Sequence, residues 1–250
     1  MDDNSKINKL ILKSAYIVII VLIIAVIALL ILKYEVEGEQ NMPFKLSSII
    51  VVSNAEGYQE KQSKDYVWDA EIYQINDIYL NIEKNKNYKD EEAIKSIIID
   101  NINVNENPKI GNIEIYRPST DSLQTYSYEE EYRVIDKVEY LGDKKADIKN
   151  LKISNQGNTL ILRVLNKTGK RYTSNEEEFK HSGKLLNKVD ISYEEIKSKI
   201  YFDLTIMLES GLTFKANIKL DLPAGDIAKE GSSNLEITDM KDIVFKREQI

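Results

Sequence analysis

The sequence contains no cysteine and only one histidine, His181. A chain without thiols can form no disulfide framework and has no cysteine nucleophile, and a single histidine cannot supply a histidine-rich zinc site. Proline is also scarce, with 4 residues, and no long stretch rich in glycine, serine and proline reads as a flexible linker. The fold must therefore be stabilised by a packed hydrophobic core.

Basic residues are also fewer than acidic residues. The chain carries 34 Lys and Arg against 41 Asp and Glu, which gives a formal net charge of -7. This acidity disfavours nucleic acid and other polyanions, because these ligands bind basic patches. We therefore expect no nucleic-acid partner, and an acidic surface that suits cations or basic proteins.

A long apolar run is present near the N-terminus. Residues 15–32, AYIVIIVLIIAVIALLIL, contain no charged residue, proline or glycine. As a helix the run would measure roughly 27 Å, close to the ~30 Å hydrocarbon core of a bilayer. A cleaved signal peptide is the alternative, but its apolar region is typically shorter, and no small-x-small cleavage site follows in Lys33–Glu37. The run predicts an uncleaved transmembrane helix over residues 15–32.

The charges that flank this run predict its direction. Lys6, Lys9 and Lys13 precede it, whereas a series of glutamates begins just after it. Lysine and arginine near a span tend to stay in the cytoplasm. We expect a cytoplasmic tail over residues 1–14, a linker over 33–44 and the bulk of the chain on the extracytoplasmic side of a plasma membrane.

The remaining chain is globular and mainly β by its pattern. Ile78, Leu80 and Ile82 alternate with polar residues, as in a strand with one buried face. Three further features are predicted from local signals: a turn at 53–57, a helix start with a capping box at 192–195, and a hairpin of strands 200–208 and 213–222.

A weak repeat suggests how these strands are organised. Val52-Ser53-Asn54 matches Ile153-Ser154-Asn155, and Glu92–Ser96 matches Glu194–Ser198, at an offset of about 100 residues. Chance matches in a chain rich in Ile, Lys, Asn and Glu are the alternative. The repeat predicts two tandem β-sandwich-like, Ig-like domains after the transmembrane helix. Their expected bounds are 45–120 and 148–250, with a tyrosine-rich link over 121–147.

The candidate catalytic and metal-binding groups are weak. His181 lies beside Ser182 in a charged loop, where neighbouring side chains usually point apart. The segment 100–106 departs from the EF-hand pattern and is better explained as a strand with one wet face. The acidic runs 129–131 and 176–178 are typical of solvated loops. The sequence therefore predicts no catalytic, cofactor-binding or metal-binding residue.

An aromatic group and a sequon are the other candidates. Tyr66, Trp68 and Tyr73 could form a platform for a sugar or a partner, although Tyr73 would face away from the other two. The favoured interpretation is that the single tryptophan anchors a sandwich core. The stretch 166–168 is a formal glycosylation sequon to which we assign no role.

Several short motifs carry a resemblance that covers most of the chain. They are Met42-Pro43-Phe44-Lys45, Ser53-Asn54-Ala55-Glu56-Gly57, Ile115-Tyr116-Arg117-Pro118, Ile153-Ser154-Asn155-Gln156-Gly157 and Ile243-Val244-Phe245-Lys246-Arg247. With the preceding anchor, this set resembles a group of single-pass membrane-anchored proteins from low-GC Gram-positive bacteria that has no assigned function. The resemblance implies a bacterial plasma-membrane location and no particular chemistry.

These observations together predict a non-enzymatic, membrane-tethered interaction or scaffold protein of the cell envelope. Its expected partners are the lipid bilayer, through residues 15–32, and another envelope protein that contacts an acidic surface or a strand edge. No cofactor is expected. The alternatives are an extracytoplasmic ligand- or cation-binding module and a hydrolase without a recognisable motif.

Overall fold

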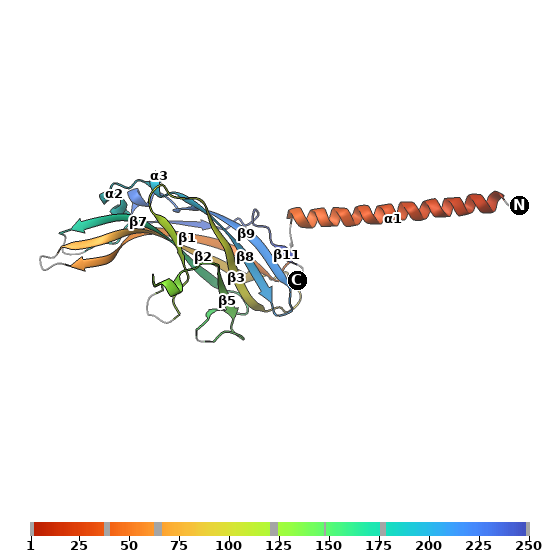
Figure 1. Cartoon of the computed structure of the whole chain (residues 1–250). Helices are drawn as coiled ribbons and strands as arrows, with labels where there is room; N and C mark the ends of the chain where they lie inside the picture. Colours follow the sequence, from red (N-terminus) through yellow and green to blue (C-terminus); the bar gives the residue numbers. More distant parts are fainter. Residues whose placement is uncertain are drawn as a thin grey trace.

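The chain forms a long N-terminal helix followed by a β-sandwich (Figure 1). The computed structural model describes residues 3–37, 41–62, 67–120, 125–147, 149–175 and 179–248. In this part of the chain the structure is mainly β, as the alternating pattern predicts. The short helices in the sandwich are η1 (Glu130–Tyr132), α2 (Lys184–Lys188), α3 (Tyr193–Ile196) and α4 (Ile227–Glu230).

Helix α1 (Asp3–Glu37) contains the predicted apolar run. Its segment Leu12–Leu32 is long and apolar enough to cross a membrane, and none of it is buried against the rest of the protein. An apolar helix without a protein partner is stable in lipid, where its side chains leave water. A signal sequence near the N-terminus can also be long and apolar enough to meet this criterion, so the helix confirms one candidate span and leaves its processing and orientation open.

Within the described residues, eleven strands form two sheets that pack face to face. The five-stranded sheet has the order β10 (Ser233–Ile237), β1 (Phe44–Gln62), β2 (Trp68–Lys84), β7 (Thr159–Ser174), β4 (Asn112–Tyr116). The six-stranded sheet has the order β11 (Lys246–Glu248), β9 (Thr213–Leu222), β8 (Ser198–Leu208), β3 (Ile94–Glu106), β5 (Lys137–Gly142), β6 (Leu151–Ile153). All of the described pairings are antiparallel except that of β5 with β6.

The expected pair of tandem Ig-like domains is not confirmed. Each sheet contains strands from both 45–120 and 148–250, and the two sets pair directly where β2 meets β7 and β3 meets β8. The predicted link 121–147 contains β5, a strand of the six-stranded sheet. Each predicted half thus supplies strands to both sheets, and the two halves bury their apolar faces against each other in one shared core.

The segments that match in the repeat have different structures. Val52 lies in the middle of β1, whereas Ile153 is the last residue of β6. The second match, between segments 92–96 and 194–198, leads into β3 and β8, which are neighbours in the same sheet. The matches therefore do not mark equivalent positions in two domains.

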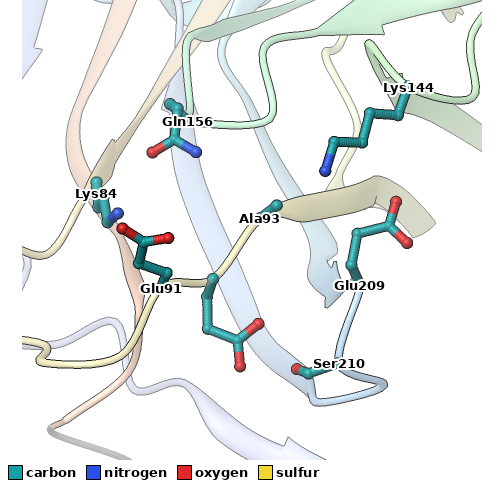
Figure 2. A pocket seen from close by; sticks show the side chains of 8 residues that line it. Lys84, Glu91, Ala93, Lys144, Gln156, Glu209 and Ser210 are labelled. Atoms are coloured by element: carbon teal, nitrogen blue, oxygen red, sulfur yellow. The ribbon is translucent and has the colours of Figure 1, made fainter.

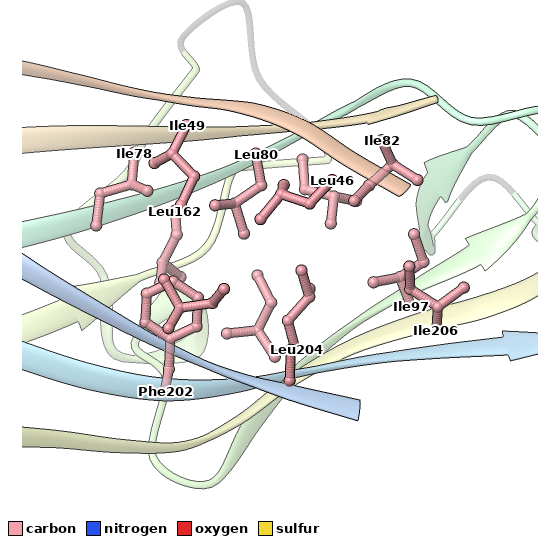
Figure 3. Close-up of a cluster of buried hydrophobic side chains, with 14 of the residues drawn as sticks. Leu46, Ile49, Ile78, Leu80, Ile82, Ile97, Leu162, Phe202, Leu204 and Ile206 are labelled. Carbon is pink, nitrogen blue, oxygen red and sulfur yellow. The ribbon is translucent and has the colours of Figure 1, made fainter. Parts of the chain in front are cut away.

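The core confirms the predicted alternation. Ile78, Leu80 and Ile82 of β2 are buried and point toward Leu204 and Ile206 of β8 (Figure 3). Residues between them on β2 point to the outer face of the sheet. The hairpin of β8 and β9 and the capping box at Ser192 are also present, with the Ser192 amide donating to Glu195 at 2.9 Å.

The predicted turn at 53–57 is wrong, because these residues continue β1 and pair with β2. Ser53, Ala55 and Gly57 are buried on the inner face. A Cβ on Gly57 would lie 2.4 Å from the ring of Phe179, so the glycine provides close packing here. Beyond the end of the six-stranded sheet, β1, β2 and β7 project further (Figure 1) and pack against α2 and α4 through a second apolar cluster.

Candidate functional site

The most distinctive site lies on the outer face of the five-stranded sheet. Residues 125–134, from the predicted link, fold back over this face and bring Tyr126, Tyr128 and Tyr132 against strands β1, β2, β7 and β4. We call residues 125–134 the covering segment. We call these tyrosines and their aromatic neighbours on the strands the tyrosine cluster. Its members are Tyr58, Tyr73, Tyr116, Tyr126, Tyr128 and Tyr132.

Strand alternation explains why these residues meet. Residues that flank the inward-facing core positions must point outward, so the sheet presents Glu56 and Tyr58 from β1 and Asp77 from β2. Arg163 of β7 lies directly opposite Asp77 in the sheet register. Opposite charges at directly paired positions attract each other across the strands.

Arg163 forms a bidentate ion pair with Asp77. Its Nε and Nη2 atoms donate to the two carboxylate oxygens at 2.6 and 2.7 Å, and Nη1 donates to the Tyr128 hydroxyl at 2.7 Å. The two charged side chains are only 13% and 14% exposed. Burial works to lower the pKa of the guanidinium, but the hydrogen bonds and charge of Asp77 raise it above its ordinary value.

Tyrosine rings enclose this ion pair. The Arg163 guanidinium lies 4.1 Å from the ring centroid of Tyr126. Tyr128 contacts the rings of Tyr58 and Tyr116 edge to face, both at 5.3 Å, and its hydroxyl donates to Glu56. Burial raises the phenol pKa values of Tyr126 and Tyr128, so both hydroxyls stay neutral near pH 7. The Tyr128 hydroxyl is hydrogen-bonded to Arg163 and Glu56, whereas the Tyr126 hydroxyl is buried without a hydrogen-bond partner.

A second ionic group fixes the far side of the cluster. The Glu114 carboxylate accepts from the Tyr116 hydroxyl and from Lys167 Nζ, both at 2.6 Å. Burial alone would raise the pKa of Glu114, but these hydrogen bonds lower it below its ordinary value. The adjacent backbone is also bonded, since the amides of Arg117 and Val134 donate to the carbonyls of Tyr132 and Ile115 at 3.0 and 2.8 Å.

The covering segment leaves a cavity of about 700 Å³ beside the cluster. Its lining consists of Glu56, Gly57, Tyr58, Thr125, Tyr126, Ser127, Tyr128, Glu129 and Arg163. Glu56 and Glu129 bring two carboxylates, and hydroxyl groups and aromatic rings form most of the remaining surface. The cavity therefore combines a rigid base with groups that can stack on a ligand and accept its hydrogen bonds.

A second cavity of about 600 Å³ lies at the end of the sandwich where β1 begins. Figure 2 shows Lys84 beside Glu91 on one wall and Lys144 near Glu209 on the other. Both signs of charge are present, and the lining contains no aromatic side chain. This cavity therefore lacks the aromatic rings on which a ligand could stack at the tyrosine cluster.

The sheet edges were the other expected contact surface. Backbone bonds from the covering segment occupy part of the outer edge of β4. Strand β10 is the opposite edge, and Leu235 in it is 41% exposed. A five-residue edge with one exposed leucine gives a partner little to recognise compared with the cavity.

His181 and Ser182 bind different backbone groups. The Gly57 amide donates to His181 Nδ1 at 3.2 Å, while Ser182 Oγ donates to the Gly231 carbonyl at 3.4 Å. The acidic run 176–178 lies outside the described residues. Among the residues that the structure does describe, no group of three or more acidic or histidine side chains could hold a metal.

The segment 100–106 is the predicted strand with one wet face. Asn101 and Asn103 are exposed, whereas Ile102 and Val104, which alternate with them, pack against the core. The sequon asparagine, Asn166, is 1% exposed and donates to Gln74, so its side chain is closed to modification.

The three residues of the suggested aromatic platform do not form one surface. Trp68 packs against Phe179 at a centroid distance of 6.3 Å in the second apolar cluster, which agrees with a core role. Tyr73 faces the opposite side and belongs to the tyrosine cluster. Tyr66 lies outside the described residues.

Sequence reasoning missed Arg163, Asp77 and Glu56 as site residues. In the sequence these three residues lie in three different strands, far from one another. Only the pairing of those strands brings them together. One signal was available, because the chain has 15 tyrosines against 5 phenylalanines, and Tyr126 and Tyr128 lie in a polar stretch without strand or helix period. Buried tyrosines need partners for their hydroxyls, which indicates a polar cluster.

Comparison of the chain with protein-family models, with curated proteins and with solved structures finds no match. The geometry and chemistry of the cavity are therefore the guide to its function.

Proposed function

We propose that this protein is a non-enzymatic, membrane-tethered binding protein on the extracytoplasmic side of a bacterial cell envelope. Helix α1 would be the uncleaved anchor, with residues 1–14 in the cytoplasm. Support comes from the exposed apolar segment Leu12–Leu32, from the lysines that precede it and from the glutamates that follow. An acidic, cysteine-free sandwich is compatible with this location.

The cavity at the tyrosine cluster is the proposed binding site. The observation that carries the proposal is a contrast between its base and its walls. In the base, Asp77 neutralises Arg163 and holds it rigidly, so the protein has already ordered these groups before a partner arrives. In the walls, Glu56, Glu129 and Tyr58 border open space. Rigid aromatic anchors beside polar groups are typical of protein-binding surfaces.

Photo-crosslinking in intact cells tests the binding role. A photoreactive amino acid replaces Thr125, an exposed residue of the cavity lining, in the full-length chain. The matched control carries the same group at Lys219, which is exposed on β9 of the other sheet. We expect one discrete protein adduct from position 125 that is absent from position 219. Identical adducts from both positions, or none from position 125, would contradict the proposal.

A small-ligand module is the second candidate, because a volume of about 700 Å³ also falls in the range of small-molecule sites. In that case the crosslinker at position 125 yields no protein adduct, and a small ligand added to the purified chain raises its melting temperature. The two candidates therefore differ in the size of what occupies the same cavity.

A further inference from the structure

We propose that the cavity at the tyrosine cluster recognises a cationic side chain, the ammonium of a lysine or the guanidinium of an arginine, on its protein partner. This inference rests on the proposed binding function and specifies its chemistry. Three observations support it: the cavity lining offers hydrogen-bond acceptors, the lining has an excess of carboxylates, and tyrosine rings of the cluster already contact two arginine side chains.

The only positive charge in the described lining is not free to bind an anion. Arg163 uses Nε, Nη1 and Nη2 for bonds to Asp77 and Tyr128. The ring of Tyr126 lies against the guanidinium at 4.1 Å. An anionic ligand would have to compete with a bidentate carboxylate for this group, and it would also approach Glu56 and Glu129.

The lining offers hydrogen-bond acceptors instead. Glu56 accepts from Tyr128 through Oε1, and Glu129 is exposed on the covering segment. With Arg163 neutralised by Asp77, these two carboxylates leave the cavity with an excess of negative charge. A carboxylate accepts hydrogen bonds and donates none, so the complementary group is a cationic donor.

The tyrosine cluster already pairs its rings with cations. The Arg117 guanidinium lies 4.9 Å from the ring centroid of Tyr132, and the Arg163 guanidinium lies 4.1 Å from that of Tyr126. Tyr58 lines the cavity, where a ligand can reach it. Its ring stacks on another tyrosine, Tyr73, at 5.1 Å, which holds it in place. A cation that enters between Tyr58 and the carboxylates therefore gains both charge attraction and a cation–π contact.

The size of the cavity favours a side chain that belongs to a peptide over a free amine. A volume of about 700 Å³ exceeds what one ammonium group needs and leaves room for the backbone on either side of the residue. A neutral sugar could also stack on tyrosine and donate to carboxylates. It would not require negative charge, and this difference separates it from a cationic side chain in the experiment.

The test is a titration of the full-length chain in detergent micelles, followed by NMR. The probes are N-acetyl-lysine methylamide, its neutral isostere N-acetyl-norleucine methylamide, and N-acetylglucosamine as a neutral sugar. We expect the lysine probe to bind roughly tenfold more tightly than the isostere, since an exposed ion pair and a cation–π contact each favour the charge. Added salt should weaken this binding.

Two pairs of variants locate the effect. Glu129→Gln should weaken the lysine probe by about two- to fivefold, whereas Glu131→Gln, in the same exposed acidic run but outside the cavity lining, should leave it unchanged. Tyr58→Leu should weaken it by a similar factor, and Tyr201→Leu on the other sheet should not. Glu129 is exposed, so its substitution tests recognition without disturbing the fold.

The inference is overturned if the isostere or the sugar binds as tightly as the lysine probe, if the lysine probe does not bind, or if both glutamate variants weaken it equally. These outcomes differ from failure of the proposed function. A discrete adduct from position 125 together with no preference for the cationic probe would support the binding role and refute only its chemistry. Absence of that adduct would contradict the protein-binding role itself.

Discussion

The buried ion pair between Asp77 and Arg163 can be tested by removing one partner at a time. Asp77→Leu would leave the Arg163 guanidinium, 13% exposed, without its bidentate carboxylate. Breaking a buried pair in this way costs about 3–5 kcal/mol, because an uncompensated charge stays in the protein. Solvent reaches part of this pair, so we expect the lower end, about 3 kcal/mol. In a domain of about 200 residues this lowers Tm by roughly 6–12 °C.

The double variant Asp77→Leu with Arg163→Met removes both charges and keeps apolar volume beneath the tyrosine cluster. Replacing a buried pair by apolar residues is often neutral or stabilising, so we expect a free energy of unfolding within about 1 kcal/mol of the parent chain. The difference between the double variant and the sum of the single variants measures the coupling between the two side chains.

Urea unfolding of the full chain in detergent provides the assay. Fluorescence of Trp68, the only tryptophan, reports on the second apolar cluster, and near-ultraviolet circular dichroism reports on the packed tyrosines. The reasoning is refuted if Asp77→Leu costs less than about 1 kcal/mol, or if the double variant is as unstable as the two single effects added together.

Three further results are expected. Gly57→Ala should lower the free energy of unfolding by about 1–3 kcal/mol, because the added methyl group would lie 2.4 Å from the Phe179 ring. Glu114 has a folded-state pKa below its ordinary value of 4.5, so its contribution to stability is complete above that value and is lost as pH falls through the folded-state pKa. Glu114→Gln should therefore make Tm fall less steeply under acid. Finally, Ser232→Cys, at an exposed site, should react with a membrane-impermeant thiol reagent in intact cells, because the proposed topology places the sandwich outside.

Each of these results has a control. Ser232→Ala changes an exposed side chain and should leave urea unfolding unchanged, which distinguishes overpacking at Gly57 from a general sensitivity to substitution. For the acid profile, Ser232→Ala leaves every titratable group in place and should keep the parent slope. Labelling of Ser232→Cys only after the cells are lysed would place the sandwich in the cytoplasm and contradict the proposed topology.

Local patterns predicted the elements well. The alternation of Ile78, Leu80 and Ile82, the hairpin of β8 and β9 and the capping box at Ser192 all depend on residues that are close in sequence. The turn predicted at 53–57 failed because small and polar residues there serve another purpose. Gly57 admits the ring of Phe179, and the Ser53 hydroxyl binds Asn76 inside the sandwich.

Strand partners and the cavity could not be predicted in the same way. Nothing local to β2 indicates that it pairs with β7, so two tandem domains were as compatible with the pattern as one interleaved sandwich. The cavity needs this pairing, since it places Arg163 opposite Asp77. It also needs the covering segment. The polar residues of this segment predicted a link between domains, but its tyrosine rings pack against the sheet.

The interleaved order of the strands also governs when the protein can fold. Strand β1 follows the anchor directly, but its neighbour at the sheet edge is β10, and the opposite sheet has β11 at its margin. A chain that emerges N-terminus first must therefore keep β1 unpaired along that edge until nearly all of the sandwich has been made. Long-range pairing of this kind is slow and exposes apolar strands to misassociation. A chain tethered by α1 would meet this hazard at the membrane surface.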